Sequence, residues 1–127
     1  MCHQTVSLVA RHLEANGIPT VIVGSAMDIV IHCGVPRFLF TDFPLGNPAG
    51  HPGNPTMQSE IMRLVFDLLD SADAPRSVVT APFRWRDDPE WRNRYGQIDP
   101  VKIAKLREAG EERRKKQEAA KALKLGA

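Results

Sequence analysis

The feature that most constrains the fold is a short apolar run, TVIVG, at residues 20–24. A β-branched run of this length is typical of a strand that is buried on both faces of a parallel sheet. Asn16-Gly17 and Pro19 stand just before it, and they end the preceding helix because Gly caps helices and Pro cannot continue them. The run therefore predicts a sheet whose faces are covered by helices.

Helical and strand-like segments alternate over the first 84 residues. The expected order is helix 3–16, strand 20–24, helix 26–33, strand 36–42, a helix from Pro55 through Leu68, and strand 77–83. This alternation predicts an α/β fold, a small three-layer domain with a short parallel sheet. We expect right-handed crossovers to place helices on both faces of that sheet.

Residue spacing also predicts which side chains pack in the core and which cap the helices. The first helix has apolar residues at helical spacing: Val6, Val9, Ala10 and Leu13. The helix after the long loop has a clearer stripe: Met57, Ile61, Leu64, Val65 and Leu68. Ser25 is expected to cap helix 26–33, with Gly34 after its end, and Asn54 or Thr56 is expected to cap the later helix.

The chain changes character after residue 84. We expect residues 85–100 to form an extended polar segment anchored by Trp85, Trp91 and Tyr95, and residues 101–127 to form a charged C-terminal helix. Residues 102–127 hold nine Lys or Arg against four Asp or Glu, whereas the rest of the chain is mildly acidic. These shifts divide the chain into a domain at 1–84, a segment at 85–100 and a basic helix or tail at 101–127.

Nucleic-acid binding, a membrane span and a metal site are not favoured. Acidic residues offset the arginines that surround Trp85 and Trp91, so arginine–carboxylate pairs over a packed aromatic patch are favoured there. The basic tail is better read as a solvated or partner-binding helix. No apolar run reaches the roughly 18–20 residues of a membrane span, and the N-terminus does not resemble a signal peptide. The four histidines and two cysteines show no metal-ligand spacing. A cytoplasmic protein is the simplest expectation.

Cys2 and His3 stand where the first helix is expected to begin. Ligands of α/β proteins gather where helix N-termini face the carboxyl ends of strands, and a thiolate is stabilised there by the helix dipole. Cys2 is therefore a candidate redox or nucleophilic residue with His3 as its acid–base neighbour; the alternative is an incidental terminal thiol. Cys33 is expected to be a buried apolar residue, with a second redox thiol as the alternative.

A loop rich in Pro and Gly, DFPLGNPAGHPGNPT, follows the strand at 36–42. Rigid Pro and permissive Gly often shape a backbone-lined pocket in such loops. The alternative is a plain connection from a strand to a helix. The candidate pocket residues are Asp42, Pro44, Leu45, Gly46, Asn47, Pro48 and His51.

Three stretches together resemble a known family: CHQTVSLVARHLEANGIPTVIV, GVPRFLFTDFPLGNPAG and APFRWRDDPEW. They resemble the selenoprotein B family of glycine, sarcosine, betaine and D-proline reductases, over about residues 2–95. The resemblance implies an oxidoreductase that acts on carbon–nitrogen bonds of amino-acid-type substrates. Its implied partners are other reductase subunits or a small thiol or selenol protein. It implies no cofactor in this chain, because the family's pyruvoyl group belongs to a different subunit.

The resemblance assigns Cys2 to the second, resolving position of a redox pair. In the family a selenocysteine or cysteine stands three residues earlier, and here that position would fall before Met1. The chain is then either a truncated reading of a longer gene or a reduced relative with one thiol. The leading hypothesis is a thiol-dependent reductase subunit or fragment. One alternative is a non-catalytic subunit that docks through its C-terminal helix, and another is a nucleic-acid-binding protein. A homo-oligomer is compatible with the reductase hypothesis and with the non-catalytic subunit.

Overall fold

The computed structural model describes residues 2–95, 97 and 99–125, in two compact units, Met1–Pro89 and Glu90–Ala127. Met1 lies outside the described residues. Residues 126–127 of the predicted C-terminal helix lie outside them too. Each unit is described below by itself.

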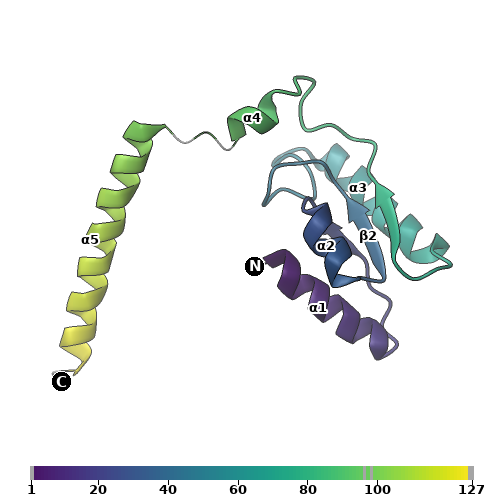
Figure 1. Ribbon diagram of the computed structural model, residues 1–127, viewed down its shortest axis with the longest axis horizontal. Helices are drawn as coiled ribbons and strands as arrows, with labels where there is room; N and C mark the ends of the chain where they lie inside the picture. The colour runs from purple at the N-terminus through teal and green to yellow at the C-terminus, as the bar shows by residue number, and fades with distance from the viewer. Residues whose placement is uncertain (1, 96, 98, 126–127) are drawn as a thin grey trace. The chain divides into compact units, whose positions relative to one another are not determined.

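The first unit is a three-layer α/β domain, as predicted. Its elements are α1 (Cys2–Ala15), β1 (Ile22–Gly24), α2 (Met27–Cys33), β2 (Arg37–Phe40), α3 (Pro55–Ser71) and β3 (Ser77–Thr80). The strands are parallel in the order β1-β2-β3, with Phe38 paired to both Ile22 and Val78. In Figure 1, α1 and α2 lie in front of the sheet and α3 lies behind it. All three strands are shorter than their predicted ranges.

Neighbouring residues of β2 separate the core into two clusters. Phe38 and Leu39 are both fully buried, and they point to opposite faces because side chains alternate along a strand. The Phe38 cluster faces α1 and α2 and also contains Ala10, Ile22, Val30 and Val35. The Leu39 cluster faces α3 and also contains Phe43, Ile61, Leu68 and Ala81. The stripe predicted for the later helix is confirmed, because Met57, Leu64 and Val65 pack against this second cluster.

The two crossover connections have opposite hands. Both advance in the same direction across the sheet, but α2 covers one face and α3 covers the other. One connection is therefore left-handed, a rare arrangement, and the prediction that both are right-handed is wrong. Since α1 and α2 together cover the Phe38 face, α3 packs on the Leu39 face, which would otherwise be exposed.

The first helix follows only part of the orientation that its apolar residues predict. Ala10 is buried and Leu13 is half-buried, as predicted, whereas Val6 and Val9 are 44% and 51% exposed and Ser7 is buried in their place. Towards the end of the helix, Glu14 accepts hydrogen bonds from the Arg37 side chain at 2.7 Å and from the Thr20 backbone at 2.8 Å. These bonds hold the Ser7–Glu14 face of α1 against the sheet and leave the predicted Val6–Val9 stripe in solvent.

The helix ends partly match their predicted caps. Asn54 Oδ1 accepts a bond from the Met57 amide at 3.0 Å, which confirms Asn54 as the cap of α3. Gly34 ends α2 with a φ of 69°, as predicted for its position. The prediction that Ser25 caps α2 is wrong: the N-cap is Ala26, without a side-chain bond.

The second unit contains α4 (Trp91–Tyr95) and α5 (Pro100–Leu125). Part of the segment predicted to be extended is thus helical. Trp91 and Tyr95, one turn apart, meet edge to face at 6.3 Å, and the Arg92 guanidinium lies 5.1 Å from the Trp91 ring centre. Asp99 Oδ1 accepts a bond from the Val101 amide at the start of α5. Trp85 belongs to the first unit and packs against the Leu39 cluster.

Candidate functional site

Thr41 joins the carboxyl ends of β1 and β2 to the loop that follows. Its side chain is fully buried, and its backbone amide donates to the Gly24 carbonyl at 2.9 Å. Its hydroxyl donates to the Pro48 carbonyl at 2.9 Å and lies 3.5 Å from the Ser25 hydroxyl. One residue therefore holds the middle of the Pro- and Gly-rich loop against the edge of the sheet, where α/β proteins place their ligands.

His3 lies at the same edge. A Cβ added at Gly24 would be 3.3 Å from the Phe38 ring and 3.4 Å from His3 Cδ2, so the imidazole packs directly over the end of β1. The His3 carbonyl also accepts a bond from the Ser7 hydroxyl at 2.6 Å. The half-buried His3 ring is thus brought to the strand ends that also hold the loop through Thr41.

Cys2 is an exposed free thiol at the first position of α1. The first turn of a helix has backbone N–H groups without intrahelical partners, and its dipole favours negative charge. Helical spacing places Cys2 on the same face as Val6, Val9 and Leu13. The thiol therefore stands at the end of the exposed apolar stripe of α1.

The loop candidates from Pro44 to Pro48 form a series of tight turns. The Asn47 amide donates to the Pro44 carbonyl at 3.0 Å, and Gly46 has a φ of 92°, which a side chain would strain. Pro44 is buried, and Asn47 and Pro48 are half-buried, while Leu45 is 56% exposed. Asp42 is half-buried and engaged with other groups.

His51 is held by Trp85. The two rings stack with centroids 3.7 Å apart, and His51 Nε2 donates to the Trp85 carbonyl at 2.6 Å. The Gln58 side chain donates to the His51 carbonyl at 2.8 Å. His51 therefore fastens the end of the loop to the segment after β3. Sequence spacing gave no sign of this contact, because the partners lie far apart in the chain.

Cys33 lies at the far end of α2 from this edge. The helix begins just after β1 and rises about 9 Å over its length. The Cys33 carbonyl accepts a bond from Arg11, and the residue lines an open groove of about 440 Å³ with Gln4, Asp28, Ile29 and His32. Cys33 is half-buried, and both cysteines are free thiols.

Neither a metal cluster nor a membrane span is present in the part of the chain that the structure describes. Within residues 2–95, 97 and 99–125, no group of three or more His, Cys, Asp or Glu side chains could hold a metal ion. Within the same ranges, none of the helices has the length and hydrophobicity needed to cross a bilayer.

Comparison with known proteins finds a similarity between this chain and a reductase subunit. The chain is 32% identical over 84 residues to the gamma subunit of D-proline reductase from Acetoanaerobium sticklandii. The match covers 66% of this chain and 35% of the relative, so the chain spans about a third of the protein that it resembles. No protein-family profile and no solved structure matches the chain.

Proposed function

We propose that the chain is a thiol-dependent subunit or fragment of an amino-acid reductase of the selenoprotein B type, with Cys2 as its redox or nucleophilic thiol. The main support is the position of the Cys2–His3 pair. The pair opens α1, and His3 packs on the end of β1, which Thr41 ties to the Pro44–Pro48 loop. The relation to a D-proline reductase subunit supports the same reaction class.

The proposed reaction is a two-electron reduction of a carbon–nitrogen bond. The Cys2 sulfur bonds to the substrate carbon while the nitrogen leaves with the bonding electrons and takes a proton, for which His3 is the nearest proposed donor. A second thiolate then attacks the Cys2 sulfur and forms a disulfide. The carbon departs with its electron pair and takes another proton. The substrate gains two electrons, and two thiols become one disulfide.

The second thiol in this scheme comes from outside the described residues. Cys33 lies about 9 Å along α2 from the strand ends, so it is badly placed to attack Cys2. A small thiol or selenol protein would supply it. With a family-type selenocysteine or cysteine before Cys2, that residue would instead attack the carbon, and Cys2 would be the second thiolate. We propose no other cofactor in this chain. A cytoplasmic location goes with the proposal, because reducing compartments preserve free thiols.

Alkylation of the two cysteines tests the proposal. Cys33→Ser leaves Cys2 as the only thiol, and Cys2→Ser leaves Cys33. We expect iodoacetamide near neutral pH to modify Cys2 severalfold faster than Cys33 and faster than free cysteine, since thiolates are the nucleophiles. We also expect His3→Gln to slow the reaction of Cys2. Mass spectrometry of timed samples measures the rates, and a Cys2 no faster than free cysteine would rule out the proposal.

A second candidate is a non-catalytic subunit that binds other reductase subunits. The observation that favours it is the unpartnered stripe of α1, in which Val6 and Val9 are about half exposed beside Cys2. A surface of this kind is typical of a protein contact. Val9→Lys would abolish co-purification with a larger reductase protein under this candidate, while leaving the alkylation rate of Cys2 in the isolated chain unchanged.

A further inference from the structure

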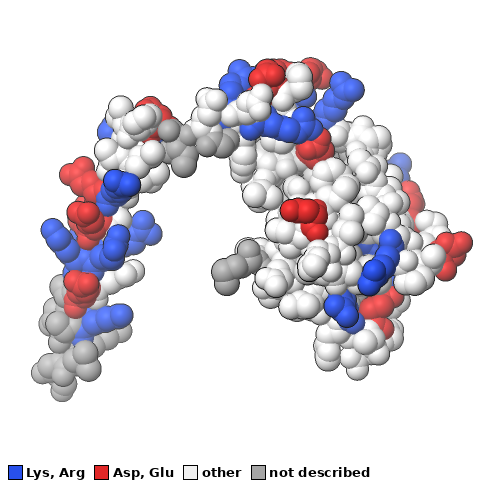
Figure 2. Space-filling model, in the orientation of Figure 1, with Lys and Arg blue, Asp and Glu red and all other residues white. Residues whose placement is uncertain are grey.

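The helix α5 is exposed to solvent along its length and carries an excess of positive charge. Every residue from 101 to 121 whose burial the structure describes is exposed, apart from Gly110. Residues 102–127 hold nine Lys or Arg against four Asp or Glu. Figure 2 shows Lys and Arg side chains along this helix. An exposed helix with this balance attracts anionic partners.

Helical geometry separates the two signs of charge on α5. At about 100° per residue, the cations fall within an arc of about 200°, which we call the basic face: Lys102, Lys105, Arg107, Arg113, Arg114 and Lys121. The carboxylates share an arc of about 120° on the other side with Lys115: Glu108, Glu111, Glu112 and Glu118. Lys116, at the edge of the basic face, lies 2.8 Å from Glu112, but both side chains are exposed, so the pair is weak.

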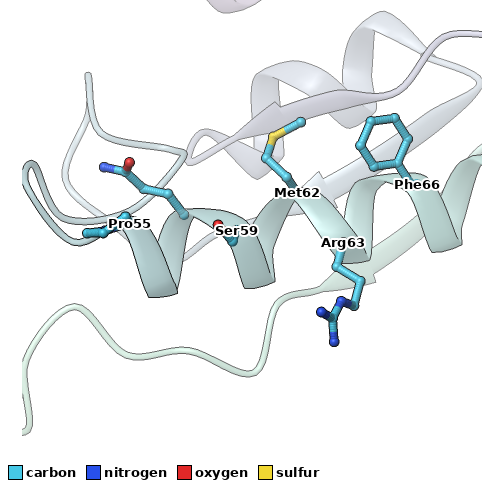
Figure 3. Close-up of a pocket in the computed structure, with 6 residues that line it drawn as sticks. Pro55, Ser59, Met62, Arg63 and Phe66 are labelled. Carbon is cyan, nitrogen blue, oxygen red and sulfur yellow. The ribbon is translucent and has the colours of Figure 1, made fainter.

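The basic face offers few apolar side chains. Among the side chains that the structure describes, its large apolar residues are Ile103 and Leu106, both in the first two turns of α5. The helix α3 of the first unit provides a contrast. It has an open hollow of about 510 Å³, where Met62 and Phe66 lie on the same side of the helix (Figure 3). Apolar rows of that kind drive contacts by burial. Affinity at the basic face of α5 therefore has to come from charge.

This composition disfavours two kinds of anionic partner. Protein interfaces are enriched in aromatic side chains and depleted in Lys, whereas α5 has no aromatic residue and its basic face carries four Lys. Helices that lie on anionic membranes bury an apolar side rich in Trp, Phe or Leu. A phosphate backbone is different, because Lys and Arg bind its oxygens without any apolar burial. The basic face therefore fits a nucleic acid best.

The width and length of the basic face favour a DNA duplex over other nucleic acids. The major groove of B-form DNA is about 12 Å wide and admits an α-helix, with phosphates on both of its walls. Cations spread over about 200° can reach both walls at once, and Lys102 to Lys121 span about 28 Å of the helix axis. The major groove of duplex RNA is too deep and narrow for this arrangement.

We propose that α5 binds double-stranded DNA, with its basic face on the phosphates of the major groove and its carboxylates toward solvent. Phosphate contacts carry no sequence information, so we expect no sequence preference. The dissociation constant expected for such contacts is about 10⁻⁶ to 10⁻⁴ M at physiological salt. The inference is independent of the chemistry proposed for Cys2, since no residue of α5 takes part in it.

Salt-dependent binding of the full chain to DNA tests the proposal. Fluorescence anisotropy of a labelled duplex of mixed sequence, about 24 base pairs long, measures the association constant from about 20 to 200 mM salt. We expect the logarithm of this constant to fall against the logarithm of salt concentration with a slope of about −4 to −6, as for roughly five to seven phosphate contacts.

Arg113→Gln and Lys115→Gln form a matched pair, because each removes one charge and the two residues lie on opposite sides of α5. We expect Arg113→Gln to weaken binding severalfold and to make the slope shallower by about 0.9, while Lys115→Gln changes the affinity by less than about twofold. Arg107→Gln with Arg113→Gln and Arg114→Gln is expected to weaken binding by at least about tenfold and to make the slope shallower by about 2.7. Circular dichroism verifies that each variant retains its helices.

Three results would overturn the proposal. They are the absence of binding at the lowest salt, a slope shallower than about −2, and equal effects of the Arg113 and Lys115 substitutions. The competing probes are single-stranded DNA and duplex RNA of the same sequence, poly-L-glutamate, and vesicles of phosphatidylcholine and phosphatidylserine in equal parts. Binding to any of these that is as tight as binding to the DNA duplex at the same salt would also overturn it.

Discussion

At the scale of single residues, Thr41 is the side chain that most shapes the candidate site. Its hydroxyl is inaccessible to solvent and satisfies the Pro48 carbonyl, while its amide satisfies Gly24. The sequence predicted that the loop matters but gave no reason to select Thr41, because a threonine at a strand end is common. Its importance comes from a contact seven residues along the chain that only the folded loop creates.

Thr41→Val is expected to destabilise the first unit by about 1–3 kcal/mol, because the isosteric side chain leaves the Pro48 carbonyl buried without its donor. Thr41→Ser retains the hydroxyl and is expected to lose less. Urea unfolding, followed by far-ultraviolet circular dichroism, measures both. Equal stability of the valine and serine variants would show that the hydroxyl does not hold the loop.

At the scale of elements, the periodicity of the sequence predicted which segments are helices and strands. It predicted less accurately which face of each helix is buried and which residue caps it. The stripe from Met57 to Leu68 identified the buried face of α3, since its five apolar residues outnumber Met62 and Phe66 on the exposed face. On α1, by contrast, two faces could have packed on the sheet: one with Val6 and Val9, and one with Ser7 and Ala10. The second face is buried because Glu14 bonds to the sheet side of the domain. The bonds that Glu14 makes with Arg37 and Thr20 are tertiary, so spacing alone could not rank the two faces.

The cap of α3 gives a prediction at this scale. Asn54→Ala is expected to destabilise the first unit by about 1 kcal/mol, since the Met57 amide loses its side-chain acceptor. Asn54→Asp keeps an acceptor at the N-terminus of the helix and is expected to retain the stability. Thermal unfolding of the two variants measures the difference. A loss of the same size in both would mean that the cap contributes nothing.

At the scale of the whole molecule, the alternation of helical and strand segments predicted the three-layer α/β fold. It could not predict the contacts between residues far apart in the sequence. The stacking and hydrogen bonding of His51 with Trp85 depend on segments far apart in the chain. The opposite hands of the crossovers do so as well. The Glu14–Arg37 ion pair is a third such contact. It joins α1 to β2 at 2.7 Å, with side chains only 29% and 17% exposed.

Removing one partner of this ion pair is expected to cost more than removing both. Glu14→Ala leaves the half-buried Arg37 guanidinium without its carboxylate, and Arg37 Nε already has no partner among the described residues. We expect a loss of about 2–4 kcal/mol, with much of it recovered in Glu14→Leu with Arg37→Met, which replaces the pair by apolar packing. Guanidinium unfolding compares the variants. Additive losses in the double variant would contradict this account.

The unequal lengths of the two crossovers favour one order of strand pairing over the other. The β1–β2 connection is short and local, whereas the connection to β3 includes the long loop and all of α3 and is more than twice as long. Each doubling of a loop adds about 0.6 kcal/mol of closure entropy, so the first pairing is the cheaper one to form. On the ribosome, β1 and β2 also emerge first. Their pairing can therefore form while α3 is still being synthesised.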